Sequence, residues 1–228
     1  MKPTLKPRHS ASPILLGILV LGLFSTASAQ ESFSKTPTTQ QAFLHAAGDL
    51  KAKRWASARL GFRKVLKDDP ENLKAHFYLG EIEYYTHHLP QAEGYFRWVN
   101  FHDPDTPVNH YYLGRVAYDQ KRYSEALSEM EAADRLDDQI SIVHYYLGLI
   151  HYRQNDFQGS QRELERALAL DPSASKAHYA LAYLLYHNLH DPSAAVREAG
   201  AALKGDGDGP LRAKARKLMQ RIKSGDKG

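Results

Sequence analysis

A short phrase recurs in this chain every 34 residues. It reads His-Phe-Tyr-Leu-Gly at 76–80, His-Tyr-Tyr-Leu-Gly at 110–114 and 144–148, and His-Tyr-Ala-Leu-Ala at 178–182. A fixed period of this length is typical of repeat arrays, in which each unit buries its apolar face only against its neighbours. The sequence therefore predicts a stack of similar units with a long surface suited to binding.

Each period divides into two helical stretches with a short polar turn between them. In the third period we expect helices over 108–120 and 124–136, with Ser124 as the N-cap of the second. In the fourth period the same division predicts helices over 142–154 and 158–170. Proline cannot continue the helix before it but can open the next one, so Asp-Pro pairs favour a helix end. Such pairs stand at 69–70, 103–104 and 171–172.

These details resemble the tetratricopeptide repeat. Its signature has a leucine-glycine pair in the first helix, a small residue early in the second, a bulky residue four later and a closing proline. The pair recurs here as Leu79-Gly80, Leu113-Gly114 and Leu147-Gly148. The small residue recurs as Ala58, Ala92, Ala126 and Ser160, and the bulky one as Phe62, Phe96, Met130 and Leu164. The departures are His76, His110, His144 and His178 in place of the usual tryptophan, Asp138 in place of a proline, and one extra residue near His190.

The resemblance implies an all-α fold, a right-handed α-solenoid of about five helix-turn-helix repeats followed by a C-terminal capping helix. It covers about residues 39–204. We divide this range into repeats at 39–70, 71–104, 105–138, 139–172 and 173–204.

The first 29 residues have the order of a secretory signal, with a basic start, an apolar run and small residues at the cleavage position. We expect cleavage after Ala29, which places the protein in the periplasm or outside the cell. An uncleaved anchor is the alternative, although the apolar run over 14–24 is shorter than the roughly 20 residues that span a bilayer. Residues 30–38 are polar and are expected to form a flexible lead-in.

The C-terminal segment 205–228 is predicted to be a linker followed by a capping helix. Leu211, Ala215, Leu218 and Ile222 have helical spacing and would shield the end of the stack. The opposite face is strongly basic, so an amphipathic helix on an anionic membrane or another polyanion is the alternative. Removal of residues 1–29 leaves 27 basic and 26 acidic residues, which gives no general reason to expect nucleic-acid binding.

No catalytic motif is present, and the chain has no cysteine. We find no nucleophile elbow, zinc-protease helix, phosphate-binding loop or dinucleotide fingerprint. The four repeated histidines stand one per unit, roughly 10 Å apart, which is too far for one metal ion to join them. We therefore expect them to be half-buried and hydrogen-bonded, and we expect no enzyme, cofactor or metal site.

Tyrosines repeat on one face of the first helices. In proteins that this chain resembles, that face lines a concave groove and binds peptides. The alternative is that these rings stack between repeats, and both can hold together. The expected peptide-binding residues are Phe77, Tyr84, Tyr111, Arg115, Tyr118, Tyr145, Tyr152, Arg153, Tyr179 and Tyr186.

The function that follows from the resemblance is a scaffold for protein–protein interaction that binds a protein or peptide segment. Accessory work in envelope assembly, for a pilus or for outer-membrane proteins, is the alternative. A regulatory part of an enzyme system is less favoured. We expect neither a nucleic-acid partner nor a stable membrane span after signal cleavage.

Overall fold

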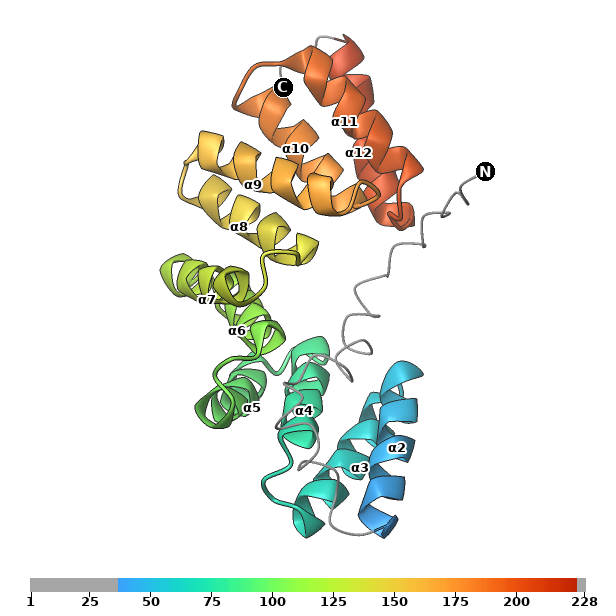
Figure 1. Ribbon diagram of the computed structural model, residues 1–228. Helices are drawn as coiled ribbons and strands as arrows, with labels where there is room; N and C mark the ends of the chain where they lie inside the picture. Colours follow the sequence, from blue (N-terminus) through green and yellow to red (C-terminus); the bar gives the residue numbers. More distant parts are fainter. Residues whose placement is uncertain (1–36, 225–228) are drawn as a thin grey trace, which may run out of the picture. The chain divides into compact units, whose positions relative to one another are not determined.

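The computed structural model describes residues 37–224, and over this range the chain forms eleven α-helices and no strand (Figure 1). The predicted all-α fold of helix-turn-helix repeats is confirmed. The expected signal at 1–29 lies outside the described residues. Pro37 and Thr38, which we assigned to the lead-in, belong to the first described helix. The described residues divide into two compact units, 37–139 and 140–224.

The N-terminal unit, 37–139, contains three helix pairs in which each helix packs against the next. The first helix of the second pair also packs against the first helix of the third. The pairs are α2 (Pro37–Lys51) with α3 (Trp55–Asp68), α4 (Leu73–Tyr85) with α5 (Leu89–His102), and α6 (Pro107–Asp119) with α7 (Tyr123–Leu136).

The C-terminal unit, 140–224, contains two helix pairs and a last helix that packs against both helices of the second pair. The elements are α8 (Ser141–Arg153) with α9 (Phe157–Leu170), α10 (Ser175–His187) with α11 (Pro192–Lys204), and α12 (Gly209–Ser224). Ala215, Leu218 and Ile222 of α12 are buried, as expected for a helix that covers the end of a stack.

The leucine-glycine pairs allow the two helices of a repeat to approach each other closely. A Cβ atom added at Gly80 would lie 2.7 Å from the ring of Phe96, and one at Gly148 would lie 2.7 Å from Leu164. Since both partners are almost fully buried, they have little room to move. Glycine is therefore required at these positions by packing and not by backbone conformation.

One residue in each turn between paired helices has a left-handed backbone. Lys121 and Asn155 have φ angles of 62° and 63°. The equivalent residue of the last pair is His190, which follows Asn155 by 35 positions and so agrees with the predicted extra residue. Both α7 and α9 begin one residue earlier than predicted, at Tyr123 and Phe157.

The Ser124 assignment is corrected. The residue before α7 is Arg122, and no side chain caps that helix. The ring of Tyr123 lies 5.6 Å from that of Tyr118 on α6. This packing places Tyr123 within the helix, so that Ser124 falls at its second position.

The repeated histidines are partly buried or buried, and they are hydrogen-bonded, as expected. The Nδ1 atom of His110 lies 2.7 Å from Glu129, and its Nε2 atom lies 2.9 Å from the Pro104 carbonyl oxygen. His178 repeats this arrangement with Glu198 at 2.7 Å and Pro172 at 3.1 Å. In both repeats the histidine on the first helix thus links that helix to the second helix and to the loop that precedes the repeat.

Candidate functional site

The first-helix face of the N-terminal unit is organised around Arg115 of α6. Its guanidinium carbon lies 4.3 Å from the ring centre of Tyr84, and three further tyrosine rings lie within cation–π range. These are Tyr85 at 5.8 Å, Tyr111 at 5.2 Å and Tyr112 at 5.3 Å. The Tyr84 hydroxyl donates a 2.6 Å hydrogen bond to Asp119, which links α4 to α6. Arg115 therefore holds rings from two repeats together.

A buried carboxyl group lies beside this cluster. Glu81 of α4 is 4 % exposed, and the Tyr112 hydroxyl donates a hydrogen bond to its Oε1 atom. Its Oε2 atom has no hydrogen-bond partner in the described part of the chain. Burial raises the pKa of Glu81 to about 7, although the Tyr112 hydrogen bond and the Arg115 charge act in the opposite direction. Glu81 therefore changes charge near neutral pH.

The structure corrects the expectation for Phe77. Its side chain is fully buried and meets the rings of Phe96 and Tyr112 edge-on, at 5.7 and 5.5 Å. Tyr84 and Tyr111, which we expected at a peptide-binding surface, are only 8 % and 3 % exposed. The physical reason is that α4 packs not only against α5 but also against α3 and α6. A side of α4 that is exposed within its own helix pair is therefore covered by a neighbouring pair.

Tyr118 differs from the other predicted tyrosines of this unit. It is half-buried near the end of α6, with Tyr123 of the following helix against its ring. In this unit the stacking of rings between repeats therefore accounts for Phe77, Tyr84 and Tyr111, whereas Tyr118 keeps part of its surface exposed.

The C-terminal unit presents a more open aromatic surface. We call it the tyrosine face, and it comprises Tyr145, Tyr152, Tyr179, Tyr183 and Tyr186 on α8 and α10. Four of these rings are partly buried against the apolar core of the unit. Tyr183 is 38 % exposed, and its ring lies 6.2 Å from that of Tyr152 and 4.3 Å from that of His187. Burial, together with Tyr183, raises the pKa of Tyr152.

The tyrosine face contains four of the predicted binding residues and one that sequence reasoning did not select. Tyr145 and Tyr152, like Tyr179 and Tyr186, are seven residues apart and so share one side of their helix. Tyr183 lies between the second pair. Arg153 follows Tyr152 at the end of α8 and is exposed. The surface thus combines half-exposed rings with a cation.

Sequence reasoning also missed Tyr112 and Asp119. Tyr112 belongs to the recurring phrase, and a buried tyrosine usually needs a partner for its hydroxyl. That requirement indicates that Tyr112 has a partner, but it does not say which one. The partner, Glu81, lies 31 residues away, and it can be identified only from the packing of α4 against α6. Asp119 carried no comparable signal.

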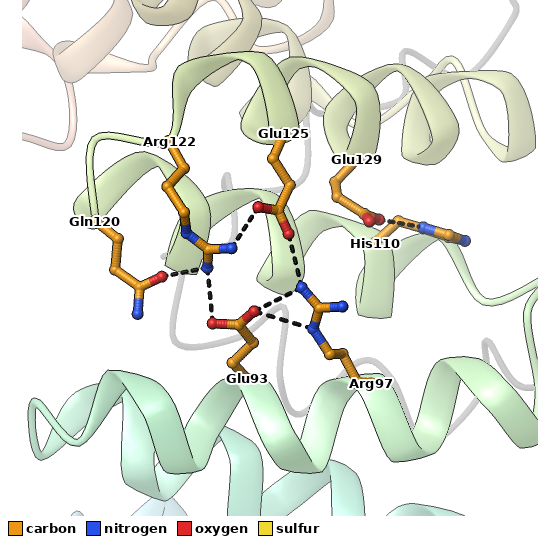
Figure 2. Close-up of polar contacts among 7 residues, drawn as sticks. All are labelled: Glu93, Arg97, His110, Gln120, Arg122, Glu125 and Glu129. Atoms are coloured by element: carbon orange, nitrogen blue, oxygen red, sulfur yellow. Dashed lines mark hydrogen bonds and ion pairs between the residues drawn. The ribbon is translucent and has the colours of Figure 1, made fainter.

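A separate cluster of charges joins consecutive repeats of the N-terminal unit, on the second helices (Figure 2). Glu93 of α5 forms ion pairs with both Arg97 and Arg122, with a nitrogen–oxygen distance of 2.7 Å in each. Glu125 of α7 accepts from the same two arginines. Because each carboxylate is shared by two cations, the network orients α7 against α5 more firmly than an isolated surface pair would.

Among residues 37–224, no three histidine or acidic side chains gather in a way that could hold a metal ion. Within the same range, no helix is long and apolar enough to cross a bilayer.

The helix pairs, the leucine-glycine contacts and the aromatic first-helix faces define a helical-repeat protein. Two sequence models described as tetratricopeptide repeat match the chain, at residues 82–139 and 141–174. The chain is therefore a tetratricopeptide repeat protein. Repeats of this kind typically serve as non-catalytic scaffolds that bind proteins or peptides. No curated protein matches the sequence.

Solved structures of other repeat proteins have the same fold. A thermophilic TPR protein of Thermus thermophilus is 20 % identical, with a TM-score of 0.66 over 80 % of this chain and 99 % of that one. PilF of Pseudomonas aeruginosa is 21 % identical, with a TM-score of 0.69 over 87 % and 94 %. YrrB, described as a TPR protein with an unusual peptide-binding site, is 15 % identical, with a TM-score of 0.60 over 86 % and 100 %. At these identities the likeness establishes the fold alone.

Proposed function

We propose that this protein is an interaction scaffold that binds an extended segment of a partner protein on the tyrosine face of its C-terminal unit. The observation that carries the proposal is the exposure of Tyr183 (38 %) among four rings that are only partly buried. Tyrosine suits such a site because its ring buries a large area at little entropic cost and its hydroxyl can bond to the backbone of a partner.

The N-terminal unit supports this choice by contrast. Tyr84, Tyr111 and Tyr112 are buried around Arg115, so their rings offer little area to a partner. Of the residues first expected to bind, we therefore retain Tyr118, Tyr145, Tyr152, Arg153, Tyr179 and Tyr186, and we add Tyr183.

A peptide-display library provides a direct test. We expect the chain from Gln30 onward to select peptides, and we expect Tyr183→Ala to weaken binding of the selected peptides about thirtyfold or more. This is the range for an aromatic anchor, whose truncation typically costs about 2 kcal/mol or more. Phe101→Ala is the matched control, because Phe101 is an exposed ring (83 %) on the second helix of a pair in the N-terminal unit and is not part of the tyrosine face.

The melting temperature of both variants decides how the result is interpreted. Binding that falls in Tyr183→Ala while its melting temperature and helical content hold supports the proposal. Equal binding by both variants, or peptides that depend on Phe101, would assign recognition to another surface.

We also propose that the protein is exported and cleaved after Ala29, on the basis of the N-terminal pattern alone. N-terminal sequencing from cell fractions tests this proposal, with a start at Gln30 expected and a start at Met1 in the envelope as the contrary result. Export would suit the alternative role in envelope assembly, which stays a prediction.

A further inference from the structure

The exposed side of α12 carries a dense set of positive charges with no negative charge among them. Six of the sixteen residues from Gly209 to Ser224 are lysine or arginine, and none is acidic. Five of the six are exposed and Arg221 is half-buried. Within residues 37–224 none of these side chains forms an ion pair. The six are Arg212, Lys214, Arg216, Lys217, Arg221 and Lys223.

These charges lie in two rows that flank the buried stripe of the helix. At about 100° per residue, Arg212, Arg216 and Lys223 fall on one side of the stripe and Lys214, Lys217 and Arg221 on the other. Arg221 lies on the side nearer α10, where burial and the Arg221 charge lower the pKa of His187. In a straight helix, residues 212 to 223 present the rows over about 17 Å.

The apolar residues of α12 are already used inside the protein. Ala215, Leu218 and Ile222 are 0 %, 6 % and 8 % exposed, because α12 packs against α10 and α11. The helix therefore cannot insert an apolar face into a bilayer without leaving its own unit. What remains outside is a basic surface that can act only by electrostatic attraction.

From this surface we infer that α12 binds the anionic headgroups of a lipid bilayer while it stays packed on its unit. A plane of fluid anionic headgroups matches two parallel rows of long, flexible cations, and each basic residue near such a surface contributes about a fivefold gain in partitioning. The helix carries no aromatic side chain on which single-stranded bases could stack. It also lacks an exposed aromatic anchor of the kind that centres most protein interfaces.

Vesicle co-sedimentation tests the inference with the chain from Gln30, which retains every described helix. We expect binding to an equal mixture of phosphatidylcholine and phosphatidylglycerol and none to phosphatidylcholine alone. Binding should disappear in molar salt, where the Debye length falls to about 3 Å. Persistent binding in molar salt would mean apolar insertion and would overturn the inference.

The charge variant Lys214→Gln/Arg216→Gln/Lys217→Gln should bind these vesicles about a hundredfold more weakly. The matched control Arg63→Gln/Lys64→Gln/Lys67→Gln removes the same charge from exposed positions of α3 and should bind within a few-fold of the unchanged chain. Circular dichroism shows whether both variants fold.

Equal losses in the two variants would mean that net charge and not α12 drives binding, and this would overturn the inference. So would binding to a DNA duplex or an oligonucleotide in the absence of vesicle binding, which would assign the surface to nucleic acid. Peptide selection on the tyrosine face is measured independently of these results, so the two proposals can fail separately.

Discussion

The two units of this protein have the same repeat but differ in charge and in the use of their tyrosines. The N-terminal unit has 13 basic and 16 acidic residues over 37–139, whereas the C-terminal unit has 12 basic and 8 acidic residues over 140–224. In the N-terminal unit Tyr84, Tyr111 and Tyr112 are buried around Arg115 and Glu81. In the C-terminal unit the equivalent rings are only partly buried, and the repeat position that Arg115 occupies in α6 carries no arginine there.

One position in the repeat differs in character between the two surfaces. Glu81, Arg115, Leu149 and Tyr183 occupy equivalent places 34 residues apart. In α4 and α6 this position carries an acidic and a basic side chain, Glu81 and Arg115, and the rings pack around them. In α10 it carries a tyrosine that is 38 % exposed. One repeat framework therefore supports a closed surface in one unit and an accessible surface in the other.

The largest expected effect is on the closed surface. Phe77→Ala should lower the free energy of unfolding of the N-terminal unit by about 3–5 kcal/mol, because it empties a fully buried aromatic site. Tyr183→Ala should cost less than about 1 kcal/mol, because its ring is partly in water already. Urea unfolding measured by tryptophan fluorescence follows Phe77→Ala, since both tryptophans, Trp55 and Trp98, lie in the N-terminal unit, and circular dichroism, which includes the C-terminal helices, follows Tyr183→Ala. Similar costs for the two variants would contradict the contrast between the units.

A smaller effect concerns the buried carboxyl group. The folded state holds the Glu81 proton up to about pH 7, whereas the unfolded chain releases it near its ordinary value of 4.5. Between these values the folded state binds more protons, so stability falls as pH rises from 4.5 to 7, by up to about 3 kcal/mol. Glu81→Gln keeps an acceptor for the Tyr112 hydroxyl and should remove this slope.

The measurement is the urea midpoint of tryptophan fluorescence at several pH values for the variant and the unchanged chain. Their difference cancels the titration of other groups, such as His76, whose pKa is lowered mainly by burial. An unchanged slope in Glu81→Gln would mean that the carboxyl group stays ionised in the folded protein.

The smallest effect should be shared by the two units. Both ring nitrogens of His110 and of His178 face acceptors, so each ring must carry two protons to donate both hydrogen bonds. The hydrogen bonds to Glu129 and Glu198 raise the pKa of these histidines. A raised pKa gives stability that is fully present below about pH 6.5 and is lost as pH rises through the folded-state value.

Glu129→Gln and Glu198→Gln should therefore each cost about 1 kcal/mol at pH 6 and much less at pH 9. Tryptophan fluorescence follows the first variant, and circular dichroism, which includes the C-terminal helices, follows the second. A cost that is independent of pH would show that the carboxylates act by packing alone.

The period and the residue types within it were enough to predict the helix pairs, the turns and the extra residue before α11. These features depend on contacts within one repeat, and such contacts recur at fixed spacing. Gly80 illustrates the point, since its partner Phe96 lies in the same helix pair. The half-buried, hydrogen-bonded histidines were predictable for the same reason, because Glu129 and His110 belong to one repeat.

Only the tertiary structure determined which tyrosines face a partner. Within each unit, a first helix packs against its own second helix and also against a neighbouring repeat, so a single-helix pattern cannot separate a buried side from an open one. Phe77 is buried by Tyr112 from the next repeat, and Glu81 is sealed by the same residue. These contacts join residues about one period apart. Whether a ring at such a contact is buried or exposed depends on the side chains that meet there. The repeat thus determined the architecture, and the packing between repeats decided which part of it can bind.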